Sequence, residues 1–149
     1  YSGFLLTQAV GVPLWTTASL PVLWIFSGLA CAVGLVEILA STNRLSHEGL
    51  GWLPTTANLV HVAEAIVLFA FVQVALSGTP GAQAGAQYML GDMMFWAGAV
   101  GLGIVVPVIL GNIKGASALK LAGGVCAIIG ALCLRATVLF AGAFDPVIF

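Results

Sequence analysis

Four long apolar runs, separated by shorter polar segments, dominate the pattern along the chain. They cover residues 21–40, 55–76, 92–111 and 118–142. Each run holds about 20 residues or more, and at about 1.5 Å of rise per residue a helix of that length crosses the roughly 30 Å of hydrocarbon in a bilayer. The pattern therefore predicts four transmembrane helices.

Residues at and near the ends of these runs support helices. Pro21 opens the first run, where a proline suits the first turn of a helix, and Asp92 opens the third run as a capping residue. Pro107, inside the third run, lacks the N–H that would bond the carbonyl of Gly103, so we expect a kink there.

The segments outside the runs differ in character. Residues 1–9 are apolar but too short to cross a membrane, and we expect them to be the end of a preceding helix. Residues 10–20 are predicted to form an interfacial loop, because Pro13 stops a helix and Trp15 suits the level of the headgroups. Residues 77–91 are uncharged and rich in Gly, Ala and Gln, which predicts a second loop.

Composition agrees with the pattern. The 149 residues are 61% hydrophobic and only 6% charged, whereas about a quarter of the residues in a soluble domain are charged. We therefore expect residues 1–149 to form a single all-α, multi-pass membrane domain. The sequence holds no basic patch, so a nucleic-acid partner is not expected. Because Tyr1 rather than Met opens the chain, we expect a larger protein to begin upstream.

The basic residues predict the orientation in the membrane. Arg44, Lys114 and Lys120 belong to the segments 41–54 and 112–117 and to the helix end beside the latter. The loops at the opposite end hold no basic residue. Basic residues are enriched on the cytoplasmic side, so we expect these two segments in the cytoplasm and the opposite loops outside.

His61 and Glu64 are the main candidate for a functional site. They are three residues apart within the apolar run 55–76, so they lie on one face of a helix. An imidazole and a carboxylate are costly to place in hydrocarbon, and such groups usually mark interior functional sites.

Depth in the membrane groups these residues with one more carboxylate. Counted from the cytoplasmic helix ends, Glu37 lies about 5 Å deep, His61 about 9 Å and Glu64 about 13 Å. We expect the three to form an inner cluster. Two interpretations stay open. The cluster carries protons, because imidazole and a desolvated carboxylate can exchange one near neutral pH, or it only packs neighbouring helices together through hydrogen bonds.

Arg135 lies at the other side of the membrane, about 9 Å from the outer end of its helix and near the depth of Gln73. That depth is too far from Glu64 for a direct ion pair. We therefore expect an outer cluster in which Arg135 meets Gln73 or Asp92. The role expected for it is an anchor to backbone carbonyls or to an outer carboxylate, and a direct role toward a substrate is the alternative.

Metal and haem sites are not expected. Cys31, Cys126 and Cys133 all fall in apolar runs, and we interpret them as small core residues rather than as metal ligands or a disulfide. A haem held by two histidines needs both of them buried on facing helices, whereas His47 belongs to a polar segment.

Several stretches of the chain match one known family. The chain opens with Tyr-Ser-Gly-Phe-Leu-Leu, continues with Val-Pro-Leu-Trp-Thr-Thr at 12–17, and begins its first long run with Leu-Pro-Val-Leu-Trp-Ile-Phe-Ser-Gly-Leu at 20–29. Later matches are His61, Phe95-Trp96, and Leu134-Arg135 followed by Phe-Ala-Gly at 140–142. In these stretches, and across nearly all its length, the chain resembles the NrfD/PsrC family of integral membrane subunits of polysulfide reductase and related complexes.

The resemblance implies a fold and a function. Members of the family have two helix bundles, and this chain resembles the second bundle, the C-terminal half, with the end of the preceding helix. The implied function is a membrane anchor in the bacterial or archaeal cytoplasmic membrane. Such an anchor exchanges electrons between a quinone (menaquinone or ubiquinone) near the outer face and a ferredoxin-like iron–sulfur subunit, itself joined to a molybdopterin subunit.

Tyr1 matches the tyrosine that binds quinone in the family, and a tyrosine of the interfacial aromatic belt is the alternative. Two other functions stay open for the chain as a whole. It could be a fragment of a proton-coupled transporter that uses His61 and Glu64, or a purely structural anchor. Whether the chain is a non-catalytic subunit or the quinone-site subunit of an oxidoreductase complex also stays open.

Overall fold

A computed structural model describes residues 1–42, 50–113 and 117–142. These residues form helices and no strand, and four of the helices are long and apolar enough to cross a membrane. The predicted fold class, an all-α membrane bundle, is therefore confirmed. Arg44 and Lys114 lie outside the described residues, so the orientation that depends on them stays a prediction.

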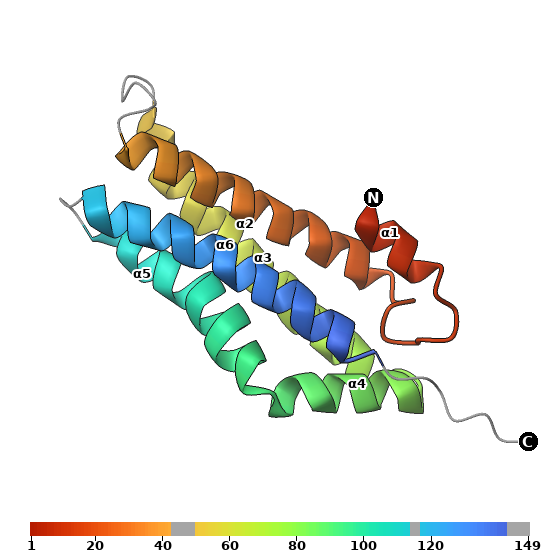
Figure 1. The fold of residues 1–149 in the computed structure, drawn as a ribbon. Helices are drawn as coiled ribbons and strands as arrows, with labels where there is room; N and C mark the ends of the chain where they lie inside the picture. The colour runs from red at the N-terminus through yellow and green to blue at the C-terminus, as the bar shows by residue number, and fades with distance from the viewer. Residues whose placement is uncertain (43–49, 114–116, 143–149) are drawn as a thin grey trace, which may run out of the picture.

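Eight helical elements follow one another along the described parts of the chain (Figure 1). The four spans begin and end within two residues of the predicted limits. The elements are α1 (Ser2–Thr7), α2 (Ser19–Ser41), η1 (Leu50–Trp52), α3 (Leu53–Leu76), α4 (Pro80–Gly91), η2 (Met94–Val105), α5 (Val106–Asn112) and α6 (Ser117–Phe140).

The spans lie side by side, with α6 packed against both α2 and η2, and α3 packed against α2 (Figure 1). The short helix α1 lies beside the start of α2, and α4 crosses the same end of the bundle. This end also holds the segment 8–18. The indole N–H of Trp15 donates a 3.0 Å hydrogen bond to the carbonyl of Val138, near the end of α6.

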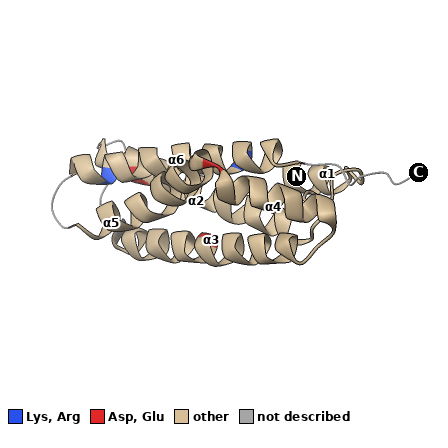
Figure 2. Cartoon of the chain, turned by 90° about the horizontal axis from the view of Figure 1, so that it is seen from below, with Lys and Arg blue, Asp and Glu red and all other residues tan. Residues whose placement is uncertain are grey.

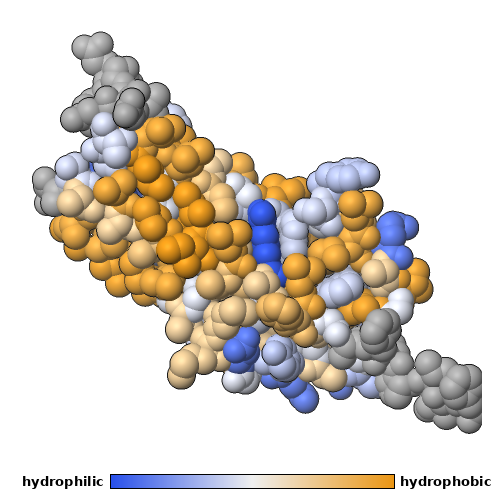
Figure 3. Space-filling view, viewed as in Figure 1, coloured by the Kyte–Doolittle hydropathy of each residue, from blue (hydrophilic) through white to orange (hydrophobic). Residues whose placement is uncertain are grey.

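The outer surface of the bundle is apolar over most of the visible face (Figure 3). Charged residues appear only as isolated segments along the helices (Figure 2). On α3, Leu59, Ile66 and Phe69 are each more than 60% exposed. Large apolar side chains on the outside suit contact with lipid, as expected for membrane-spanning helices.

Glycines allow α6 to approach two neighbouring helices closely. A Cβ added to Gly34 of α2 would lie 2.9 Å from the carbonyl oxygen of Gly124 on α6. A Cβ on Gly130, two turns further along α6, would overlap the backbone of Gly103 on η2. Small residues at such crossings let backbones pack against each other, which is a main source of helix association in membranes.

The expected loop over residues 77–91 is wrong, because most of it forms α4. Pro80 stands in the first turn of that helix, where its missing N–H costs no hydrogen bond. The high content of glycine and glutamine predicted a loop. The small residues nevertheless recur at helical spacing and bury one face of the helix, and the buried residues are Gly81, Ala82, Gly85, Ala86 and Met89.

The third span changes helix type at the predicted irregularity. Met94–Val105 form a π-helix that continues directly into α5, and Pro107 lies in the first turn of α5. A proline cannot donate the next helical hydrogen bond, so a change of pitch just before it avoids an unpaired carbonyl. Before this span, the Asp92 carboxylate accepts a 3.0 Å hydrogen bond from the N–H of Met94, as expected of a capping residue.

The close contact at Gly130 predicts a large effect on stability. Gly130→Ala should lower the free energy of unfolding by about 1–3 kcal/mol, because the added methyl group cannot fit against Gly103. The measurement is thermal unfolding of the purified protein in detergent.

Gly123→Ala is the matched control on the same helix. A Cβ there meets Leu110 at 3.5 Å, an ordinary van der Waals distance. This variant should be neutral or slightly stabilising, because alanine favours a helix over glycine. Equal stability of the two variants would contradict a glycine-dependent contact between α6 and η2.

Candidate functional site

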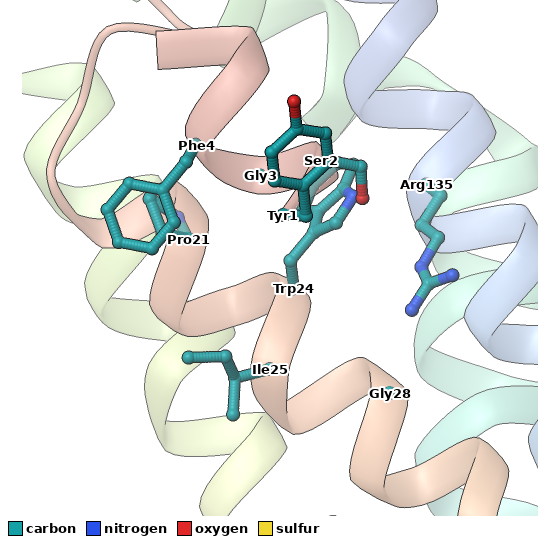
Figure 4. Close-up of a pocket in the computed structure, with 9 residues that line it drawn as sticks. All are labelled: Tyr1, Ser2, Gly3, Phe4, Pro21, Trp24, Ile25, Gly28 and Arg135. Carbon is teal, nitrogen blue, oxygen red and sulfur yellow. The ribbon is translucent and has the colours of Figure 1, made fainter.

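An open cavity of ≈ 310 Å³ lies where α1, α2 and α6 meet (Figure 4). We call it the Tyr1 cavity. It combines aromatic side chains with one arginine and otherwise small or apolar residues. Its lining residues are Tyr1, Ser2, Gly3, Phe4, Pro21, Trp24, Ile25, Gly28 and Arg135.

Gly3 brings α1 close enough to α2 to form one wall of the cavity. A Cβ at Gly3 would lie 3.0 Å from the Cα of Pro21 and 3.2 Å from the Cβ of Trp24. A larger residue at this position would push α1 away from α2. Tyr1, just before α1, is 96% exposed, and its hydroxyl group points away from Arg135 (Figure 4).

Arg135 reaches from α6 toward α2 and forms the opposite wall (Figure 4). Its Nη2 atom would lie 3.7 Å from a Cβ built on Gly28, an ordinary van der Waals distance, so the guanidinium group lies close to α2 at this position. The Nε atom is buried and has no hydrogen-bond partner among the described residues. A guanidinium group stays charged and donates up to five hydrogen bonds, so it can bind a carbonyl or anionic oxygen in the cavity.

The expected outer cluster does not form. Gln73 lines a separate groove between α3 and η2. Asp92, which caps the start of the third span, lies beside Tyr88. Neither residue lines the Tyr1 cavity with Arg135. Counting residues gave the depth of Arg135 but not its direction around the helix axis, and the side chain faces α2 rather than α3.

The structure places all three residues of the expected inner cluster in the interior of the bundle. His61 and Glu64 on α3 are 1% and 3% exposed, and Glu37 on α2 is 7% exposed. His61 Nδ1 and Glu64 Oε2 are 3.7 Å apart, which suits an ion pair if the histidine is protonated but is too long for a hydrogen bond. Glu37 interacts electrostatically with His61 and with Lys120 of α6.

Two further polar residues of α2 are Ser27 and Cys31, for which the sequence predicted no functional role. Ser27 is fully buried. Cys31, interpreted above only as a core residue, interacts electrostatically with both Arg135 and Glu64. A signal was present in the sequence, because the two polar side chains are four residues apart and so share one face of α2.

Metal-binding groups are not apparent in the part of the chain that the structure describes. No three His, Cys, Asp or Glu side chains are grouped there as they would be to hold a metal ion. Cys31, Cys126 and Cys133 are all free. The polar side chains of the Tyr1 cavity and the inner cluster can supply hydrogen bonding, charge stabilisation and proton exchange.

Comparisons with known proteins give a consistent family. A family model described as "Polysulphide reductase, NrfD" matches residues 1–146. The C subunit of polysulfide reductase from Wolinella succinogenes is 30% identical over 154 residues, which cover 95% of this chain and 49% of that protein. Protein NrfD of Escherichia coli K12 is 31% identical over 159 residues, which cover 95% of this chain and 48% of that protein.

The chain thus spans about half the length of these curated relatives. No solved structure matches it significantly.

Proposed function

Because the chain belongs to the NrfD family, we propose that it forms part of the membrane subunit of a quinone-linked respiratory oxidoreductase complex. In this proposal the subunit lies in the bacterial or archaeal cytoplasmic membrane and exchanges electrons between a quinone and a ferredoxin-like iron–sulfur subunit. A molybdopterin subunit completes the complex. The names of the two curated relatives support a place in such a complex.

The Tyr1 cavity is the observation that carries the quinone part of the proposal. Its volume, ≈ 310 Å³, is at the lower end of the range usual for small-molecule sites. The ring of a quinone is flat and apolar with two carbonyl oxygens. The Trp24 indole provides an apolar surface for the ring, while the Tyr1 hydroxyl and the Arg135 guanidinium can donate hydrogen bonds to the oxygens.

The position of the cavity also suits a quinone. Arg135 lies about 8 Å from the end of α6, within the membrane-spanning part of the helix. A hydrophilic group interrupts the apolar face that α2 and α6 present in Figure 3. A headgroup bound there can leave its long apolar tail in the surrounding lipid.

The end of the bundle beside the Tyr1 cavity supports docking of the iron–sulfur subunit. There the segment 8–18, α4 and the end of α6 pack together: Leu14 is fully buried, and a Cβ on Gly85 of α4 would meet its side chain at 2.9 Å. A pre-formed surface of this kind can bind a partner with little ordering cost. Docking at this end would place the iron–sulfur centres near the proposed quinone.

The inner cluster supports a second part of the proposal, namely that electron transfer is coupled to proton movement. His61 and Glu64 are buried near each other in the membrane, and imidazole takes up and releases protons near neutral pH. A proton-coupled transporter would use the same residues. Copurification of the full-length protein with redox subunits would contradict the transporter.

Replacing the Tyr1 hydroxyl tests the quinone site. In the full-length protein within its complex, Tyr1→Phe should lower quinone-linked turnover about three- to tenfold, because one hydrogen bond to the quinone is lost. The measurement is reduction of the terminal substrate driven by quinol, over a range of quinol concentrations.

Tyr88→Phe is the matched control, since Tyr88 is the other tyrosine of the chain and lies on α4, outside the Tyr1 cavity. Its turnover should equal that of the unaltered complex. Unchanged turnover in Tyr1→Phe would remove Tyr1 from the quinone site. If Arg135→Met also left turnover unchanged, the chain would be a structural anchor.

Two substitutions in the inner cluster test proton coupling. His61→Ala and Glu64→Gln should lower the number of protons moved per electron in proteoliposomes, while quinone-linked turnover in uncoupled vesicles is retained. Gln73→Leu, at an exposed position of α3, is the control and should leave the ratio unchanged. If the ratio stays the same in all three variants, His61 and Glu64 serve only to pack the helices.

A further inference from the structure

Several polar atoms are buried between α2, α3 and α6 without a partner among the described residues. They are the Ser27 hydroxyl oxygen and both ring nitrogens of His61. Ser27 is 0% exposed and His61 is 1% exposed. Leaving such groups unpaired costs about 1–3 kcal/mol each, so buried polar groups in proteins are nearly always hydrogen-bonded to protein or to ordered water.

We call Arg135, Ser27, Cys31, Glu64 and His61, which come from α6, α2 and α3, the polar seam. Arg135 of α6 reaches the α2 backbone at Gly28, next to Ser27. Cys31, one helical turn further on, lies within electrostatic range of both Arg135 and Glu64. On α3, Nδ1 of His61 lies 3.7 Å from Oε2 of Glu64.

The unpaired atoms of the polar seam suit water molecules. A buried water needs two to four polar partners and commonly satisfies polar groups that have no partner in the protein. His61 Nδ1 lies 3.7 Å from Glu64 Oε2, too far for a direct hydrogen bond, so the imidazole needs another partner.

We propose that a chain of buried water molecules occupies the polar seam and connects Arg135 in the Tyr1 cavity to Glu64 and His61. Arg135 and the inner cluster, which lie at different depths in the membrane, are then joined by one route for protons. A proton enters the row of water molecules at one end as another leaves at the other end, so each water molecule accepts one proton and releases one. The role of these water molecules in proton transfer deepens the proposed function and rests on it. The presence of water in the polar seam does not depend on the proposed function.

Cys31 provides a native reporter of water in the polar seam. When the full-length protein in lipid nanodiscs is transferred to D₂O, a thiol reached by water exchanges S–H for S–D, which infrared spectroscopy detects as a loss of the S–H stretching band. Difference spectra against Cys31→Ser and Cys133→Ser assign the bands of the two thiols.

Cys133 is the matched control. It is partly buried like Cys31, but its side chain packs against Gly98 of η2, with distances of 2.8 and 2.9 Å to a Cβ built there. We expect the Cys31 band to disappear at least tenfold faster than the Cys133 band. Ser27→Val, which replaces a hydroxyl of the seam by methyl groups, should slow exchange at Cys31 and leave Cys133 unchanged.

Exchange at Cys31 no faster than at Cys133 in the unaltered protein would overturn the water chain, whatever the behaviour of Ser27→Val. The measurement uses the resting protein and needs no quinone. Its failure would therefore leave the Tyr1 and Arg135 turnover results standing. Unchanged turnover in those variants would, conversely, contradict the quinone site without affecting the exchange result.

Discussion

The close approach of α6 to its neighbours is the contact on which the rest of the bundle depends. Inside lipid there is no hydrophobic drive to bring helices together, so association relies on packing and on hydrogen bonds. The glycine pairs 34–124 and 103–130 let the backbone of α6 pack directly against α2 and η2. Because α6 is in contact with both helices, it fixes where α2 and η2 lie relative to each other.

The candidate site follows from that packing. With α6 held close to α2, Arg135 lies beside Gly28 and lines the Tyr1 cavity. Helix α2 in turn packs against α3, which carries His61 and Glu64. One charged side chain then serves two purposes: it lines the cavity proposed for a quinone, and it stands at the end of the polar seam that leads to His61 and Glu64.

Much of the fold could be predicted from the sequence, because lipid requires every spanning segment to satisfy its own backbone hydrogen bonds, and an apolar run of sufficient length can do so only as a helix. The inner cluster could be predicted for a similar reason, since helical spacing fixes the relation of His61 to Glu64. Helix α4 was missed because glycine and glutamine favour loops, and its stability comes from burial against Leu14 and the end of α6. The direction of Arg135 was missed because it depends on how two helices meet.

The central claim is that a quinone headgroup binds in the Tyr1 cavity between Tyr1, Trp24 and Arg135. An experimental structure of the intact complex with a bound quinone-site inhibitor tests it most directly. We expect inhibitor density against the Trp24 ring, with an oxygen within hydrogen-bonding distance of the Tyr1 hydroxyl or the Arg135 guanidinium. Density for the inhibitor elsewhere in the complex, with lipid occupying the Tyr1 cavity, would contradict it.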